Sequence, residues 1–517
     1  MKRFGRKRRR ERQQRFELRR TAIAGAVVGL LCGVVCCDPA RGQVEFEQPP
    51  IDYHQAAVND PVARLQARID AGEATLDFDE HFGYLPAALE ALGVSTSSQA
   101  LVFSKTSFQA RRISPRTPRA LYFGDDVYVG WVQNGDVMEF SAVDTGLGAN
   151  FYTLAQEPGE RPVIRRQTHD CLQCHASSLT QGVPGHIVRS VLPDAKGQPI
   201  LKAGTFATNH ASPLVERWGG WYVTGRHGAQ RHLGNLRAER TQEIADVDLA
   251  PGANVTDLSA YLDTSQYLTG HSDLVALMVL EHQVTMHNLI AKANFLTRIT
   301  LRDARVLAEM LDRPSDEYTE STLQRIRSAG EPLVRHLLFS GEARLTEPVA
   351  GTSTFAEEFS ARGPRDDRGR SLRDLDLTRR MFRYPCSYLV YSDAFDALPD
   401  PAKAYVYRRL WEVLTAEPAD DANADEPFAH LSRDDRQAIA EILVATKPGL
   451  PDYLARRLKR PGLFQRPGPY PQRVRVQSAH RRLAPPRSRP PPRPLKRPCL
   501  AIDRRRQGVR RRRCRYR

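Results

Sequence analysis

Two cysteines three positions apart, with a histidine directly after the second, constrain this chain more than any other feature. The segment reads Cys171-Leu172-Gln173-Cys174-His175. Thiols at this spacing can each bond one vinyl group of a porphyrin, and the adjacent imidazole then reaches the iron. With 8 cysteines and 14 histidines in 517 residues, chance gives the pattern roughly 0.003 times per chain. The sequence therefore predicts one covalent haem c on Cys171 and Cys174, with His175 as the proximal iron ligand.

Three other uses of these residues are open. A zinc site could combine Cys171, Cys174 and His175 with His169, although no second CxxC, CxxH or HxxxH cluster is present to complete it. A redox-active CxxC of the thioredoxin type is expected near a βαβ pattern, which the sequence does not show. A disulfide across a two-residue loop has poor geometry. Haem attachment is the prediction that these comparisons favour.

The N-terminus has the pattern of an export signal. Residues 1–20 hold eleven Lys or Arg and two Glu, and residues 21–37 are almost wholly apolar. The apolar run is short for a spanning helix, which favours a cleaved signal peptide, comprising residues 1–42, rather than a permanent membrane anchor. If uncleaved, residues 21–37 would associate the chain with a membrane. Because haem is attached to CxxCH outside the cytoplasm, we expect an exported protein of the periplasm or cell envelope.

The formal net charge of +16 is not spread along the chain. Residues 461–517 hold nineteen basic side chains and one acidic side chain, so with the basic N-terminus removed as well, residues 21–460 carry −11. Nucleic-acid binding requires a basic patch on the folded part, and we therefore exclude it. The segment 461–517 is rich in Arg and Pro with few apolar residues, which predicts a disordered basic tail.

Between the two ends, the hydrophobic pattern changes from strand-like to helical. Residues 43–118 are predicted as an N-terminal helical and extended segment, with helices at 61–72 and 84–92. Residues 119–257 are predicted as a β-rich haem region, with strands at 121–123, 127–132, 137–143, 151–154, 201–206 and 221–224. Residues 258–460 are predicted as a helical subdomain, with helices at 273–295, 300–311, 319–328, 332–339, 401–415 and 432–445. The predicted fold class is α+β, an antiparallel β-rich region followed by helices.

The sixth iron ligand decides whether a haem only carries electrons or also binds small molecules. His282 and Met286 share one stripe of the predicted helix 273–295. His186, His210 and His227 lie in predicted loops, together with His232. All of these are distal candidates, and each has the alternative of an ordinary packed or turn residue.

Several further residues are predicted to surround the haem. The loop Gly182-Val183-Pro184-Gly185 is expected to offer a carbonyl group to the second ring nitrogen of His175, in competition with a plain turn. Trp218-Gly219-Gly220-Trp221-Tyr222 and Arg226 are candidates for lining the porphyrin, with strand packing as the alternative. Cys386 has no partner once the haem thiols are used, which predicts a buried free thiol.

Four segments together resemble a group of bacterial cell-envelope proteins that carry a single c-type haem in a cytochrome c domain. They are Ser114-Pro115-Arg116-Thr117-Pro118-Arg119-Ala120-Leu121-Tyr122-Phe123, Cys171 to His175, Val183-Pro184-Gly185-His186 and Arg217-Trp218-Gly219-Gly220-Trp221-Tyr222-Val223-Thr224-Gly225. The likeness covers residues 45–455. It implies haem binding and electron transfer through Cys171, Cys174 and His175, and it assigns no distal ligand.

The function expected from the sequence is that of an exported monohaem c-type cytochrome, which transfers single electrons to or from a redox partner protein in the cell envelope. The alternative is a haem oxidoreductase, peroxidase-like or acting on another small molecule, with an open distal site. About 420 residues remain between the two ends, which exceeds what a simple carrier needs and motivates this alternative. The sequence leaves open whether the protein is an enzyme.

Overall fold

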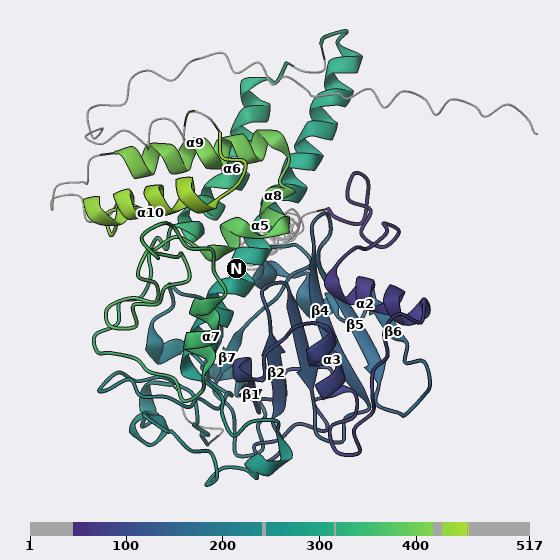
Figure 1. Ribbon diagram of the computed structural model, residues 1–517, viewed down its shortest axis with the longest axis vertical. Helices are drawn as coiled ribbons and strands as arrows, with labels where there is room; N and C mark the ends of the chain where they lie inside the picture. Colours follow the sequence, from purple (N-terminus) through teal and green to yellow (C-terminus); the bar gives the residue numbers. More distant parts are fainter. Residues whose placement is uncertain (1–44, 240–243, 315–316, 417–425, 452, 454–517) are drawn as a thin grey trace, which may run out of the picture. The chain divides into compact units, whose positions relative to one another are not determined.

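The computed structural model describes residues 45–239, 244–314, 317–416, 426–451 and 453 (Figure 1). The predicted signal peptide at 1–42 and the predicted tail at 461–517 lie outside the described residues. The described chain has an α+β fold, as the sequence predicts: an antiparallel sheet is followed by helices.

The main sheet is an antiparallel meander of six strands in chain order. Its strands are β1 Ala100–Val102, β2 Arg119–Phe123, β3 Val127–Trp131, β4 Val137–Asp144, β5 Gly148–Ala155 and β6 Ile164–Gln167. Tight turns join β2 to β5, and Asn134 and Gly148 adopt φ angles of 52° and 67°, which Asn and Gly tolerate. The strands predicted at 121–123, 127–132, 137–143 and 151–154 are confirmed.

One face of the sheet is covered by a packed apolar core, called the closed core below. Helices α2 Pro61–Asp70 and α3 Leu85–Ala91 pack their apolar side chains against it. Because side chains alternate along a strand, every second strand residue contributes. The buried residues on this face are Ala120, Tyr122, Val129, Trp131, Met138, Phe140, Tyr152, Leu154 and Ile164. Buried apolar side chains therefore fill this face.

The opposite face packs on α5 Leu274–Met310, a continuous helix of 37 residues. The sequence predicts two helices here, 273–295 and 300–311, and this division is wrong because Leu296-Thr297-Arg298-Ile299 contains neither Gly nor Pro to interrupt the backbone hydrogen bonds. By length and composition α5 could cross a membrane, but 94% of its most apolar 18-residue window is buried inside the protein. That burial is typical of a core helix.

Helix α6 Glu320–Leu337 also runs through a predicted boundary. Gly330 and Pro332 predict two helices at 319–328 and 332–339, which is wrong. Packing against helix α9 (Asp400–Thr415) compensates for the backbone N–H that Pro332 lacks. A Cβ atom on Gly330 would lie 2.6 Å from the Tyr405 ring of α9, so the absence of a side chain at Gly330 allows the close approach. Tyr405 then donates a hydrogen bond of 2.7 Å to Glu331.

The remaining elements are short or lie around these helices (Figure 1). They are the helices α7 Phe355–Ala361, α8 Asp393–Asp396, α9 Asp400–Thr415 and α10 Arg433–Thr446, and a separate hairpin of β7 Arg189–Val191 with β8 Thr205–Ala207. Single 3₁₀ turns are found at Thr96–Ser98, Ser178–Thr180, Leu201–Ala203, Leu214–Glu216, Ile244–Asp246, Ala250–Gly252, Thr264–Gln266 and Tyr388–Tyr391.

Two predicted strands need correction. The strand predicted at 201–206 is a 3₁₀ turn followed by β8, because Gly204, with φ of 97°, separates the two. The strand predicted at 221–224 makes only single bridges, from Trp221 to Val102 and from Thr224 to Asp273. Gly220, with φ of 83°, turns the chain immediately before it.

The largest apolar cluster joins the sheet to the helices. It contains Phe123 and Val143 from the strands together with buried residues of α5, α6, α9 and α10. The β-rich and helical segments of the sequence therefore share one core.

The start of α5 depends on one buried carboxylate. Asp273, 1% exposed, accepts hydrogen bonds from the backbone N–H groups of Val275 and Ala276 and from those of Thr352 and Ser353. We expect Asp273→Ala to lower the free energy of unfolding by at least about 2 kcal/mol, because several buried donors lose their acceptor. Urea denaturation measures this. Asp257→Ala, which removes an exposed turn carboxylate, is the control and should leave the midpoint nearly unchanged.

Candidate functional site

The CxxCH motif forms one helical turn that follows β6 directly. The turn is α4 Leu172–His175, with Cys171 at its N-cap. Cys174 is exposed and Cys171 is partly exposed, and both are free thiols. Residues three apart lie on the same side of a helix, so both sulfur atoms can reach one molecule placed beside this turn. Burial raises the pKa of the Cys171 thiol to about 11.

The imidazole of His175 is held in one orientation. Its Nδ1 lies 2.9 Å from the carbonyl oxygen of Gly185, and the Gly185 N–H donates back to the His175 carbonyl at 2.8 Å. A carbonyl oxygen only accepts, so Nδ1 carries the proton and Nε2 keeps a lone pair. Burial lowers the pKa of His175, which favours the neutral ring. The expectation that a carbonyl group of the 182–185 loop accepts from His175 is confirmed.

A partly open row of side chains on the sheet lies beside the motif. Leu121, Gly130, Glu139, Thr153 and Arg165 pair in register across β2 to β6 on the face opposite the closed core. Of these, Leu121, Glu139 and Thr153 are partly exposed and Arg165 is exposed.

Two contacts connect this row to CxxCH. Phe151, on the same face of β5 as Thr153, contacts the ring of His175 with centroids 4.7 Å apart. Arg119 and Glu139 form an ion pair of 2.6 Å. Burial has the largest effect on the pKa values of Cys171 and His175, and the opposite charges of this ion pair also act on both. The open row therefore borders the motif.

The donor set at this place fits a covalent haem. Two reachable thiols and one imidazole with a free Nε2 atom stand next to a sheet surface that is only partly covered. The zinc alternative finds less support: over the described ranges, the only group of three or more His, Cys, Asp or Glu ligand atoms close enough to share an ion lies elsewhere. His169, its fourth proposed ligand, is exposed and packs against His54.

Among the distal candidates, His186 shares a ring contact with the motif. Phe151 contacts both His175 and His186, with a centroid distance of 6.2 Å to the second ring. Nε2 of His186 lies 2.7 Å from Ser141 Oγ, and its backbone N–H and carbonyl are both hydrogen-bonded to the Asn288 side chain. The His186 ring is therefore held against the sheet, with Phe151 between it and His175.

His227 and Met286 have structural roles in the described chain. Nδ1 of His227 bonds the Gln230 carbonyl at 3.0 Å, and Nε2 accepts from the Asn254 N–H at 3.0 Å, so both ring nitrogens are used. Met286 is fully buried in the main apolar cluster. Trp218 and Trp221, candidates for lining a porphyrin, belong to the same cluster.

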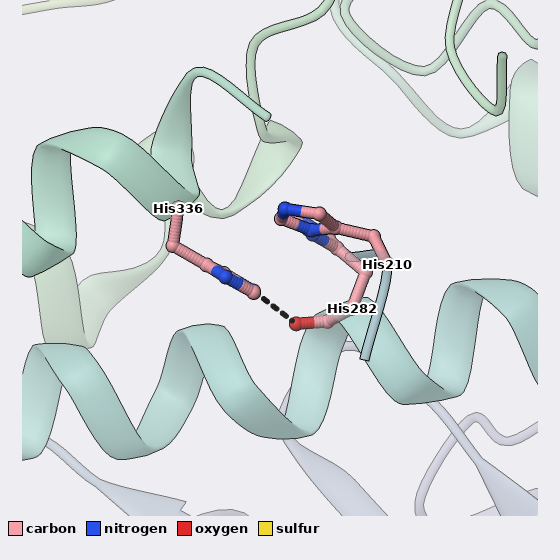
Figure 2. A group of neighbouring side chains, drawn as sticks. All are labelled: His210, His282 and His336. Atoms are coloured by element: carbon pink, nitrogen blue, oxygen red, sulfur yellow. Dashed lines mark hydrogen bonds between the residues drawn. The ribbon is translucent and has the colours of Figure 1, made fainter. Parts of the chain in front are cut away.

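The other two distal candidates, His210 and His282, meet each other and a third histidine (Figure 2). Their Nδ1 atoms are 2.9 Å apart, and the His336 ring stacks on that of His210 with centroids 4.1 Å apart. One ligand atom from each ring lies within 4.8 Å of the others. Burial lowers the pKa of all three, to about 4 for His336, so the rings are neutral near pH 7.

Buried charges surround these three histidines. Glu281 precedes His282 and forms an ion pair of 3.2 Å with Arg217, whose guanidinium also donates to the His210 carbonyl. Burial raises the pKa of Glu281 to about 7, although Arg217 opposes the shift.

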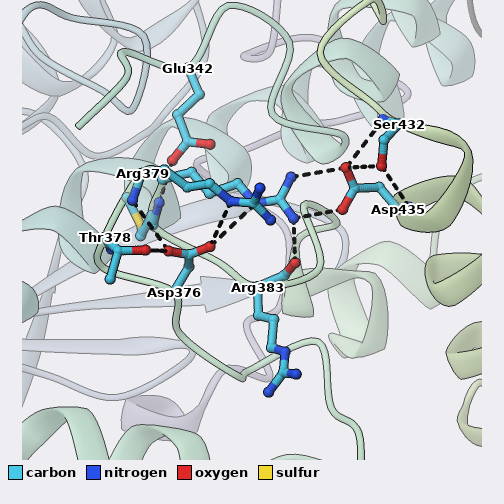
Figure 3. Close-up of polar contacts among 9 residues, drawn as sticks. Glu342, Asp376, Thr378, Arg379, Arg383, Ser432 and Asp435 are labelled. Atoms are coloured by element: carbon cyan, nitrogen blue, oxygen red, sulfur yellow. Dashed lines mark hydrogen bonds and ion pairs between the residues drawn. The ribbon is translucent and has the colours of Figure 1, made fainter. Parts of the chain in front are cut away.

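A second carboxyl group, the partly buried Glu342, lies one residue before Ala343, whose N–H bonds the His210 carbonyl. Glu342 accepts from the Met381 N–H at 2.7 Å, and burial raises its pKa to about 7. Figure 3 shows it beside the network in which Arg380 pairs with Asp435 at 2.6 Å. This network fixes the loop before Arg383 to the N-terminus of α10.

Sequence reasoning missed His336 and His287. His336 follows Ala329 and Leu333 at helical spacing on the buried stripe of α6, so the same periodicity that selected His282 could have found it. His287 lies beside Tyr128, whose hydroxyl is 3.3 Å from Nδ1 of His287, and its ring centroid is 6.0 Å from that of His186. It was missed because it lies off the stripe on which His282 and Met286 were selected.

Comparisons with protein-family models, with curated proteins and with solved structures find no match.

The buried histidines predict a dependence of stability on pH. Burial lowers the pKa of His287 to about 4, so below about pH 6.5 the unfolded chain binds a proton at this residue that the folded chain does not. Stability therefore falls as the pH drops from about 6.5 to 4. We expect His287→Gln to reduce the slope of unfolding free energy between pH 4.5 and 6 by up to about 1.4 kcal/mol per pH unit.

Denaturant titrations at a series of pH values measure this slope. His81→Gln, at an exposed position, is the matched control. An unchanged slope in His287→Gln would show that His287 is already charged in the folded protein.

Proposed function

We propose that the protein is an exported monohaem c-type cytochrome that passes single electrons to or from a partner protein in the cell envelope. The observation that carries the proposal is the pair of hydrogen bonds between His175 and Gly185, next to two reachable thiols. A disulfide between Cys171 and Cys174 would give the His175 ring no task, and a zinc site would lack the fourth ligand expected for it, because His169 packs against His54. A bound haem supplies a one-electron couple at the iron.

The chain's own residues then have distinct tasks. Cys171 and Cys174 hold the porphyrin by thioether bonds, and His175 presents Nε2 to the iron while Gly185 fixes its ring. Asn288 fixes the loop that contains Gly185, because its side-chain amide accepts from the His186 N–H and donates to the His186 carbonyl. A Cβ atom on Gly185 would lie 2.3 Å from Asn288 Oδ1, so this close approach requires glycine.

Covalent attachment is the first test. The chain, exported from cells that attach haem to CxxCH, should retain haem after acid-acetone extraction, and its mass should include one haem. Cys171→Ser or Cys174→Ser should weaken retention, and the double variant should abolish it. Cys386→Ala removes a thiol that is free and fully buried, and it should keep haem at the wild-type level. A mature chain with bare thiols, or with zinc on them, would contradict the proposal.

A haem oxidoreductase with an open distal side is the second candidate function. It is favoured by one observation: His186, His210, His227, His282 and Met286 all have other partners in the described chain. None of these contacts places a second ligand opposite Nε2 of His175.

Ligand binding separates the two candidates. If a sixth ligand closes the iron, the ferric absorption spectrum should be low-spin and unchanged by cyanide or peroxide, which supports a carrier. A high-spin spectrum that shifts with cyanide supports the enzyme. His186→Gln identifies the ligand: it should convert a low-spin spectrum to high-spin if His186 moves onto the iron, whereas His227→Gln should leave the spectrum unchanged.

A further inference from the structure

Three imidazoles from distant parts of the sequence converge at one buried point. His210 lies in the loop after β8, His282 in the first third of α5 and His336 near the end of α6 (Figure 2). Their exposed fractions are 1%, 0% and 8%. Apolar rings surround them, with Phe339 stacked on His282 at a centroid distance of 4.3 Å. The proposed haem function gives these three side chains no task.

We propose that His210, His282 and His336 bind one divalent first-row transition-metal ion of the kind that prefers imidazole, zinc or copper, as a second metal centre separate from the CxxCH motif. Nitrogen ligands bind such an ion at about 2.0–2.1 Å, so two ligands of one ion lie roughly 2.9–3.4 Å apart. The Nδ1 atoms of His210 and His282, 2.9 Å apart, already have that separation. The ligand atom of the third ring, His336, lies within 4.8 Å of the other two. A change in its side-chain torsion angles would bring it to the separation that one ion requires.

Hydrogen bonds to one nitrogen of a ring leave the other nitrogen with a lone pair. Nε2 of His336 donates to the His282 carbonyl at 3.2 Å, so its Nδ1 keeps the lone pair. Nε2 of His282 lies 2.7 Å from Ser387 Oγ. When this nitrogen donates to Ser387, Nδ1 of His282 also has a lone pair. Outer partners that fix the second ring nitrogen in this way are typical of metal-binding histidines.

Without a cation, only one proton can lie between Nδ1 of His210 and Nδ1 of His282, so one nitrogen donates and the other accepts. Nε2 of His210 is buried with no hydrogen bond of good geometry among the described residues, so no such bond fixes which nitrogen of His210 carries the proton. A metal ion between the two Nδ1 atoms would use both lone pairs at once.

The ligand set selects the class of ion. Three imidazoles with no carboxylate or thiolate among them favour zinc, copper, nickel or cobalt over magnesium, calcium or manganese. Glu281, the nearest carboxylate along the chain, is paired with Arg217, so its negative charge lies beside the site without being a ligand.

Metal analysis of the haem-loaded, full-length protein tests the proposal. We expect about one zinc or copper per chain in addition to haem iron, or uptake of one equivalent after dialysis against zinc. X-ray absorption at the edge of that metal should show nitrogen neighbours and no sulfur. Sulfur neighbours would place the ion on Cys171 and Cys174 and overturn the proposal, and so would the absence of any bound ion after dialysis.

Variants locate the ion. His210→Gln, His282→Gln and His336→Gln should each lower zinc affinity at least about 100-fold, while haem absorbance is unchanged. Ser387→Ala keeps all three ligands and should lower affinity about 10-fold or more by freeing the His282 ring, which keeps the test valid if a ligand variant fails to fold. His227→Gln, a buried histidine outside the cluster, is the control and should retain the ion.

Haem and metal are counted separately in these measurements. A protein with the ion and no haem would contradict only the proposed function, and a protein with haem and no ion would contradict only the metal centre.

Discussion

The fold depends on burying α5 with its polar side chains satisfied. Eight polar residues of this helix are buried, and five of them, Glu281, His282, Gln283, His287 and Asn288, lie close together in its N-terminal half. An unsatisfied polar group in a core is costly, so each of these side chains dictates a contact with another segment. Gln283 bonds the Gly124 carbonyl and the Tyr128 hydroxyl, and Glu281 bonds Arg217. These contacts set how the sheet and the loops after it meet the helix.

Both candidate sites are positioned by this same stretch of α5. Asn288 holds the loop that fixes His175, and His282 contributes a ring to the histidine cluster. The two residues are six apart, or roughly 9 Å along the helix axis. The buried rings of Tyr128, His186 and His287 contact one another, and Tyr128 also accepts a hydrogen bond from Gln283 of this stretch. The orientation of His175 and the position of His282 in the cluster thus both depend on polar groups of α5 and on their hydrogen-bond partners.

The sequence predicted features that depend on local chemistry. The hairpins followed from Asn134 and from β-branched strands, and the His175 acceptor followed from a Pro-Gly loop close to CxxCH. Prediction from the sequence failed where contacts between segments distant in the chain determine the structure. Nothing near Gly330 and Pro332 reports that Tyr405 of α9 packs there. Similarly, periodicity placed His282 on a buried face, but the partners His210 and His336 come from segments whose approach is set by the three-dimensional core.

The rigidity of α5 also limits how the two sites can influence each other. Coupling between sites requires an element with two arrangements that each site favours differently. Residues 274–295 of α5 are almost entirely buried, and Asp273 fixes the start of the helix through bonds to two segments. A close-packed helix of this kind resists small displacements. The shared helix therefore aligns the two sites in space, while occupancy of one should leave the affinity of the other nearly unchanged.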